Sequence, residues 1–128
     1  MEVLSSRILL RPSDPERSRH FYGDVLGLAV YREFGPPESP GVVFFLGQGF
    51  LEVSGSSNGQ ADGPVQIWLQ VRDVRSEHER LLERGAVVTR EPRQEPWGLI
   101  EMWIEDPDGV PIVLVEIPDD HPLRRDTR

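Results

Sequence analysis

The chain has 128 residues, of which 38% are hydrophobic and 28% charged, as expected for one folded domain and not for a disordered chain. It contains no cysteine, which excludes a disulfide scaffold, a thiolate nucleophile and a zinc finger. The net charge is -8, from 14 basic and 22 acidic residues, and the basic residues are all arginine. Without a basic run, a long apolar stretch or a signal-peptide pattern, we expect a cytoplasmic protein that binds neither nucleic acid nor membranes.

Alternation and capping residues predict the elements of the first half. The apolar run 7–11 is expected to form a strand that ends before a proline. Ser13 or Asp14 can cap a helix that begins at Pro15 and stops at Gly27. Strands are then expected over 28–34, 41–46 and 50–54, with a loop rich in proline and glycine at 35–41. The polar segment 55–64 connects this half to the next.

The second half repeats this order. It predicts a strand over 65–71, a helix capped by Asp73 and ended by Gly85, a strand over 86–89, a loop over 90–96, and strands over 99–105 and 111–117. The second cap follows the first by 59 residues, from Asp14 to Asp73, and the helix-ending glycines are 58 apart, from Gly27 to Gly85. Such a repeat indicates two similar modules.

The fold class that follows is α+β, with two tandem βαβββ modules whose curved mixed β-sheets carry helices on the outer face. We predict one domain over 1–128, made of modules at about 3–54 and 65–117, a linker at 55–64 and a loosely ordered tail at 118–128.

A second set of side chains is expected on the sheet faces opposite the helices. In the strand over 65–71, the apolar residues Val65, Ile67, Leu69 and Val71 alternate with polar or aromatic ones and should pack against a helix. The residues expected on the opposite faces include Arg7, Leu9, Glu52, Gln66, Trp68, Gln70 and Val113. A mostly apolar surface with a few polar groups is typical of small-molecule sites. The alternative interpretation is a sheet face that is exposed to solvent and binds nothing.

Two segments carry a family resemblance. Residues 20–28 read His-Phe-Tyr-Gly-Asp-Val-Leu-Gly-Leu, and residues 105–109 read Glu-Asp-Pro-Asp-Gly. Together with the duplicated pattern, over about residues 3–117, they resemble the vicinal oxygen chelate superfamily, which includes glyoxalase I, extradiol dioxygenases and bleomycin resistance proteins. The resemblance implies the fold and leaves the activity open, because one fold hosts many functions.

The resemblance also implies where a metal would be held. Enzymes of this superfamily usually bind a divalent metal through four side chains, and these positions correspond here to Arg7, Glu52, Gln66 and Val113. Only Glu52 is a typical ligand, because arginine stays protonated and valine has no donor atom. We therefore expect no metal and no other cofactor. Arg7 and Glu52 should lie close together, either as an ion pair or with each side chain free to meet a charged ligand.

The remaining histidines are not expected to complete a metal site. His20 falls on the first helix, His78 on the second and His121 in the tail. A lone histidine on a helix is usually a surface residue.

The segment 94–98, Gln-Glu-Pro-Trp-Gly, resembles the proline–tryptophan–glycine segment of bleomycin resistance proteins. This resemblance assigns Trp97 and Trp68 to stacking on a ligand, whereas Trp103 is expected to pack in the core. Gln70 stands where those proteins can have a second tryptophan, and the spacing to the next motif is one residue longer. The expected function is that of a homodimer that sequesters a planar or cationic antibiotic-like molecule without chemistry.

The residues predicted to bind this ligand are Arg7, Glu52, Gln66, Trp68, Gln70, Trp97 and Val113, and no residue is assigned a catalytic role. The main alternative is an enzyme of the same fold, a lyase or dioxygenase with or without a metal, in which Glu52 would be the acid or base. A module that binds another protein is a third reading.

Overall fold

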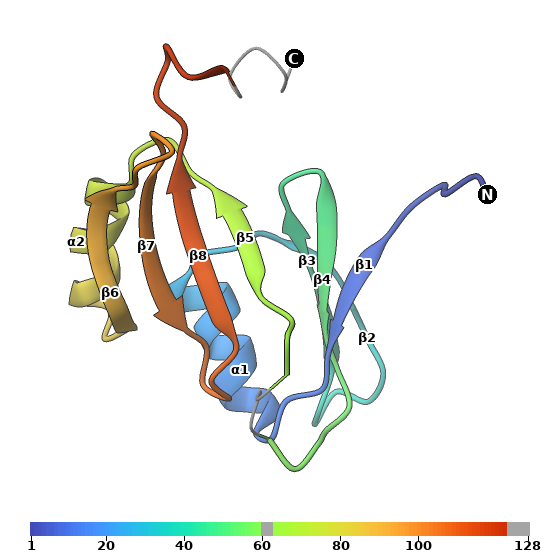
Figure 1. The fold of residues 1–128 in the computed structure, drawn as a ribbon. Helices are drawn as coiled ribbons and strands as arrows, with labels where there is room; N and C mark the ends of the chain where they lie inside the picture. Colours follow the sequence, from blue (N-terminus) through green and yellow to red (C-terminus); the bar gives the residue numbers. More distant parts are fainter. Residues whose placement is uncertain (60–62, 123–128) are drawn as a thin grey trace. The chain divides into compact units, whose positions relative to one another are not determined.

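The computed structural model describes residues 1–59 and 63–122 and divides the chain into two compact units, Met1–Ala61 and Asp62–Arg128 (Figure 1). The boundary falls within the predicted connection 55–64, of which residues 60–62 lie outside the described part, as do residues 123–128 of the predicted tail. Each unit has its own β-sheet. Within the described ranges, no helix is long and apolar enough to cross a membrane.

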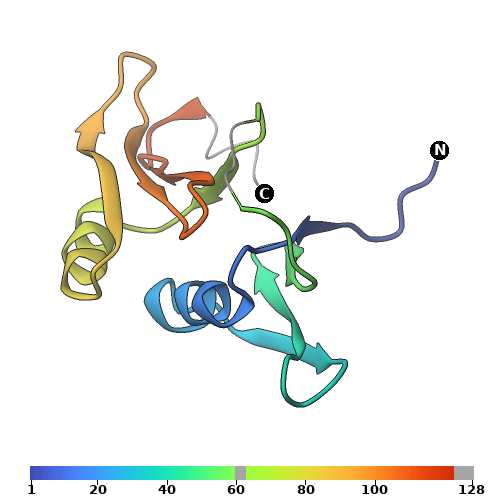
Figure 2. The ribbon, with the colours of Figure 1, turned by 90° about the horizontal axis from the view of Figure 1, so that it is seen from below.

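The first unit contains a four-stranded mixed sheet. Its elements are β1 (Arg7–Leu10), α1 (Pro15–His20), the π-helical turn η1 (Phe21–Val25), β2 (Val30–Phe34), β3 (Gly41–Leu46) and β4 (Gly49–Val53). The strand order is β1-β4-β3-β2, in which β1 is parallel to β4 and the other pairs are antiparallel (Figure 2). As predicted, the Asp14 carboxylate caps α1, accepting from the backbone N–H of Arg17 at 3.2 Å. Gly27, with a φ of 76°, follows the helical segment.

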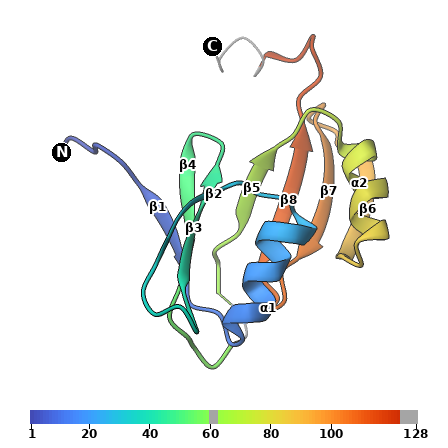
Figure 3. The same ribbon diagram turned by 180° about the vertical axis from the view of Figure 1, so that it is seen from behind.

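The second unit repeats this arrangement. Its elements are β5 (Ile67–Gln70), α2 (Val74–Glu83), β6 (Val87–Gln94), β7 (Ile100–Glu105) and β8 (Pro111–Glu116). The order β5-β8-β7-β6 matches that of the first sheet, again with one parallel pair, and α2 lies along one face of this sheet (Figure 3). Asp73 caps α2 by accepting from the backbone N–H of Ser76 at 3.0 Å. The predicted α+β fold of two tandem βαβββ modules is confirmed.

Two predicted segments of the second unit differ most from the observed elements. The loop predicted over 90–96 is in large part the second half of β6, which runs to Gln94 and includes Pro92. Proline is tolerated there because β6 is an edge strand with two shifts of register, so its missing N–H breaks no regular ladder. The strand predicted over 65–71 is shorter, and Val65, which was expected to pack against a helix, precedes β5 and is 69% exposed.

Alternation along the strands places much of the core, although Val65 is not part of it. In β4, Leu51 and Val53 are fully buried, while the intervening Glu52 reaches the opposite face. The buried core residues of the second unit that come from β7, β8 and α2 include Val74, Leu81, Met102, Ile104, Ile112 and Leu114. These buried sets leave the other faces of the two sheets to carry the polar and aromatic side chains described next.

Candidate functional site

A network of charged side chains lies on the first sheet, where β1 and β4 run parallel. The register pairs Leu9 with Glu52, so Arg7 and Arg11 lie diagonally on either side of the carboxylate. Arg7 Nη1 donates a hydrogen bond of 2.8 Å to Glu52 Oε1, so of the two arrangements that the sequence left open the structure shows the ion pair. The Arg7 side chain is 38% exposed, whereas that of Glu52 is 13% exposed. The carboxylate is therefore covered on the side where the guanidinium lies.

The second oxygen of Glu52 is also engaged. The Ser54 hydroxyl donates to Glu52 Oε2 at 2.6 Å, and Arg11 Nη1 lies 3.6 Å from the same oxygen while it donates to Ser54 Oγ at 2.5 Å. The hydrogen bonds from Ser54 and Arg7 lower the pKa of Glu52 and outweigh its partial desolvation. Glu52 is thus ionised at neutral pH, and the network of two arginines and one carboxylate has one positive charge in excess.

This network does not fit the divalent metal that the family resemblance implies. Arg7 stands at a ligand position, has no lone pair to offer and occupies the carboxylate that would bind the metal. Across residues 1–59 and 63–122 there is no group of three or more histidine, aspartate or glutamate side chains placed to hold a metal ion. His20 instead contacts Asp24, with Nδ1 2.9 Å from Oδ2.

An aromatic cluster lies beside the charged network. The ring centroids of Tyr31 and Phe45 are 5.1 Å apart, those of Tyr31 and Phe50 are 4.9 Å apart, and those of Phe45 and Phe50 are 5.7 Å apart. Tyr31 is 50% exposed and Phe45 is 44% exposed. Phe50 is the register partner of Arg7, which places an aromatic ring next to the guanidinium-bearing residue on the neighbouring strand.

Sequence reasoning missed Tyr31 and Phe45 as site candidates. The β2–β3 register shifts between Val30 and Arg32, so simple alternation does not give the position of Tyr31. The tight turn between β3 and β4 was a usable signal, because the resulting hairpin places Phe45 directly opposite Phe50.

In the second unit, Trp68 is one of two predicted ligand-binding tryptophans, and both are exposed. It lies in β5, is 52% exposed, and is the register partner of Val113 in β8. Gln70 lies two residues along the same strand, and Gln66 is exposed just before it. Val113 is 5% exposed and belongs to an apolar cluster with Leu99, Val115 and Ile117, against which the partly buried Trp103 packs. The structure therefore brings Trp68, Gln70 and Val113 to one sheet face.

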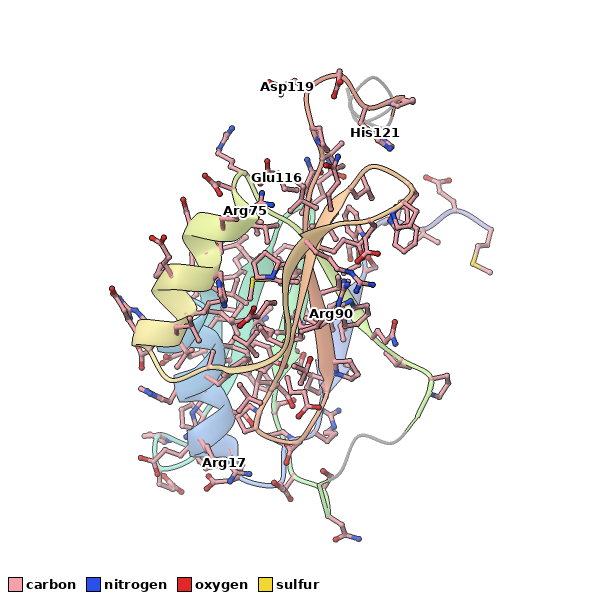
Figure 4. The ribbon with its side chains drawn as sticks, turned by 60° about the vertical axis from the view of Figure 1, so that its left-hand side comes forward. Arg17, Arg75, Arg90, Glu116, Asp119 and His121 are labelled. Carbon is pink, nitrogen blue, oxygen red and sulfur yellow. The ribbon has the colours of Figure 1, made fainter. Side chains whose placement is uncertain are left out.

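Trp97 lies in the turn between β6 and β7 and is 58% exposed. Its indole N–H donates to Glu101 Oε2 at 2.9 Å. The backbone carbonyl of Trp97 accepts a hydrogen bond of 2.9 Å from His121 Nε2. His121 lies in the segment after β8 (Figure 4). An exposed ring is thus held by contacts at both its side chain and its backbone.

The base of this turn is fixed by a buried ion pair. The Glu95 side chain is 2% exposed and lies 2.5 Å from Arg90 Nη1 and 3.1 Å from Arg93 Nε. The hydrogen bond from Arg93 lowers the pKa of Glu95, with a further contribution from Arg90, and together they outweigh the opposing effect of burial. Both arginines come from the part of β6 that had been predicted as a loop.

Comparison with known proteins places the chain in a family. A family model described as the Glyoxalase/Bleomycin resistance protein/Dioxygenase superfamily matches residues 5–114. The lactoylglutathione lyase of Salmonella typhimurium is 34% identical over 124 residues, which cover 87% of this chain and 90% of that protein. A superfamily member from Sphaerobacter thermophilus DSM 20745 has a crystal structure that matches with a TM-score of 0.74 and 27% identity, over 90% of this chain and 98% of that one.

A further solved structure shares the fold. The crystal structure of TnmS3, an antibiotic binding protein from Streptomyces sp. CB03234, matches with a TM-score of 0.72 and 20% identity, over 91% of this chain and 98% of that one. The family model and the 34% identity to the Salmonella protein establish the family of this chain. The structural matches show that the fold is shared as well. The chain therefore belongs to the glyoxalase/bleomycin resistance protein/dioxygenase superfamily.

Proposed function

We propose that this protein binds a planar small organic molecule and sequesters it without metal-dependent chemistry. The observation that carries the proposal is Arg7, which stands at a position where the family resemblance implies a metal ligand and pairs with Glu52 at 2.8 Å. A cation of the protein itself thereby takes the place that a metal would need. The antibiotic binding protein TnmS3, which has the same fold, gives a precedent for binding as a function.

Two exposed tryptophans supply the flat apolar surface that such a ligand needs. Trp68 and Trp97 are 52% and 58% exposed, which is unusual for the largest side chain in a folded protein. Rings of this kind favour planar aromatic or cationic partners. Gln66 and Gln70 flank Trp68 along the chain and offer amide groups that can orient a ligand by hydrogen bonding.

The second candidate function is that of an enzyme, favoured by the 34% identity to a lactoylglutathione lyase. Without a metal, this reading needs Glu52 as a general acid or base with a pKa near neutrality. The pKa of Glu52 is instead lowered by Ser54 and Arg7, and both of its oxygens already accept hydrogen bonds. A weaker base with both oxygens engaged is poorly suited to proton transfer, so binding is the better supported function.

The first test is metal content by mass spectrometry, after dialysis and after challenge with zinc, nickel, iron(II) and manganese. We expect no metal to be retained at one equivalent per chain. Stoichiometric metal together with lactoylglutathione lyase activity would overturn the proposal in favour of the enzyme.

The second test measures binding of a panel of planar and cationic antibiotics, by tryptophan fluorescence and by the shift in thermal unfolding temperature. We expect a ligand of this panel to change the fluorescence of the wild-type protein and to lose affinity when Trp68→Ala is introduced. Leu82→Ala is the matched control, because Leu82 is an apolar residue of α2 that is also about half exposed, at 54%, and does not belong to the sheet. A panel with no response would contradict the proposal. Light scattering on the same samples tests the homodimer that the sequence analysis predicts.

A further inference from the structure

We infer that the first sheet binds an aromatic carboxylate, with its anionic group at Arg7 and its ring against the cluster of Tyr31, Phe45 and Phe50. This inference goes beyond the proposed function, whose ligand lies against Trp68 and Trp97 of the second unit. It follows from three features of the first unit, namely the excess positive charge, the exposed rings and their adjacency on neighbouring strands.

The charge favours an anion. Arg7 and Arg11 lie on either side of the single carboxylate of Glu52. Arg7 uses one nitrogen, Nη1, for this ion pair, and Glu52 is the only hydrogen-bonding partner of Arg7 among the described residues. A guanidinium carries further N–H groups in a planar fork that matches a carboxylate. Since the Arg7 side chain is 38% exposed, these groups can be reached from solvent.

A cationic ligand is disfavoured at this place. Both oxygens of Glu52 are already engaged, by Arg7 on one side and by Ser54 and Arg11 on the other. A cation would have to displace a guanidinium, which would leave that charge without its partner. The whole-chain charge of -8 does oppose an approaching anion from a distance. At physiological salt, however, the screening length is about 8 Å, so the nearest charges decide the contact.

The rings give the surface on which an aromatic ligand would lie. Tyr31 and Phe45 are 50% and 44% exposed, and their rings contact each other and Phe50. Leu9, which is 52% exposed, extends the apolar area along β1. An exposed cluster of this kind on a soluble protein commonly marks an interaction site.

The close placement of charge and rings favours a compact ligand. Arg7 and Phe50 are register partners on neighbouring strands, whose backbones lie about 5 Å apart. A carboxylate attached directly to a ring system, without a linker, is the class of ligand that suits such close neighbours.

The test uses three probes with the same ring and different charge: 2-naphthoate, 2-naphthylmethanol and 2-naphthylmethylammonium. Binding is followed by two-dimensional NMR of the backbone amides and of the tryptophan indole N–H groups. We expect 2-naphthoate to bind roughly 10-fold more tightly than the ammonium probe. Its chemical-shift changes should centre on the amides of residues 7–9, 31, 45 and 50.

Variants separate charge from ring contact. Arg7→Gln should abolish the preference for naphthoate, Arg7→Lys should keep part of it, and Glu52→Gln should raise naphthoate affinity several-fold because it removes the competing carboxylate. Phe45→Leu should weaken all three probes alike. Arg75→Gln, which removes the same charge from the exposed start of α2, is the control and should leave all three affinities unchanged.

Several results would overturn the inference. Equal affinities, a preference for the ammonium probe, or no binding by any probe would exclude the aromatic anion. Chemical-shift changes confined to the indoles of Trp68 and Trp97 would also exclude binding on the first sheet, while leaving the proposed function intact. If the same first-unit amides shift with protein concentration alone, a second copy covers this face and the inference fails. Failure of the proposed function is read separately, from retained metal and lyase activity.

Discussion

The indole N–H of Trp97 donates a hydrogen bond of 2.9 Å to Glu101, a β7 residue that is only 8% exposed. The acceptor is anchored in the sheet, whereas the ring itself is 58% exposed. A side chain that is held at its polar edge and open on its face loses little freedom when a ligand stacks on it, which favours affinity.

Removing this acceptor should release the Trp97 ring. We expect Glu101→Leu to lower the tryptophan fluorescence anisotropy and to weaken any ligand that stacks on Trp97 several-fold, because the ring would have to be ordered on binding. Glu101→Gln keeps an acceptor oxygen and should behave nearly as the wild type. If the leucine and glutamine variants gave the same anisotropy, the hydrogen bond would have no role in holding the ring.

Glu95 should contribute to stability far more than its neighbours. Glu95→Ala removes the partner of Arg90 and Arg93 at a buried position, and we expect a loss of about 1–3 kcal/mol in the free energy of unfolding. Urea denaturation measures this loss. Glu91→Ala, on the exposed part of the same strand, is the matched control and should change stability by less than about 0.5 kcal/mol. Equal effects of the two substitutions would show that the ion pair does not hold the turn.

The stability of the protein should depend on pH through Glu52. Its pKa is lowered in the folded state from an ordinary value of 4.5, so the folded protein binds this proton less readily than the unfolded chain. The contribution is fully present above pH 4.5 and is lost as the pH falls through the lower folded-state pKa. The pKa values of Asp73 and Glu95 are lowered as well and act in the same direction.

Thermal unfolding between pH 3 and 7 measures this dependence, because this range of about 4 pH units includes the ordinary pKa values of carboxylates. Glu52→Gln should show a shallower fall in stability at the acidic end than the wild type. An identical pH profile in the two proteins would mean that Glu52 has the same pKa folded and unfolded.

The cap of α2 offers a test confined to one hydrogen-bonding group. The Asp73 carboxylate accepts from the backbone N–H of Ser76 at 3.0 Å, and this contact lowers the pKa of Asp73. Asp73→Ala should lower the free energy of unfolding, because the first turn loses its acceptor. Asp73→Asn retains a capping oxygen and should recover most of that loss. The cap would be unimportant if asparagine and alanine were equally destabilising.

Gly98 should resist substitution for two separable reasons. Its φ is 96°, which side chains rarely adopt, and an added Cβ would lie 2.9 Å from Cδ2 of His121. Gly98→Ala is expected to cost about 1 kcal/mol or more. In a His121→Ala background the steric part should disappear and the backbone part remain, so the cost should shrink without vanishing. A cost unchanged by the second substitution would assign the whole effect to the backbone.

Local rules of sequence were sufficient for much of the fold. Asp14 and Asp73 are caps in the structure because a short acidic side chain before a helix can accept from the first turn. Alternation along the strands predicted that Glu52 and Arg7 lie on the same sheet face. The parallel pairing of β1 and β4 then brings these two side chains together.

Local rules could not predict features that depend on how a strand pairs with its neighbours in the sheet. The segment 90–96 is predicted as a loop, yet β6 runs to Gln94, because an edge strand can omit the one donor that Pro92 lacks. Tyr31 was not assigned to a site because its position depends on a register shift that only the pairing with β3 defines. The positions of Gln66, Trp68, Gln70, Trp97 and Val113 are described by the structure, and their roles in binding remain predictions.

The irregular course of β6 has a consequence for solubility. A long edge strand exposes backbone donors and acceptors onto which a strand of another molecule can add, the step that begins many aggregates. In β6, Pro92 removes one donor, and two register shifts, between Val88 and Arg90 and between Arg90 and Arg93, interrupt the ladder. The strand that carries both partners of Glu95 is thus a poor template for intermolecular β-addition.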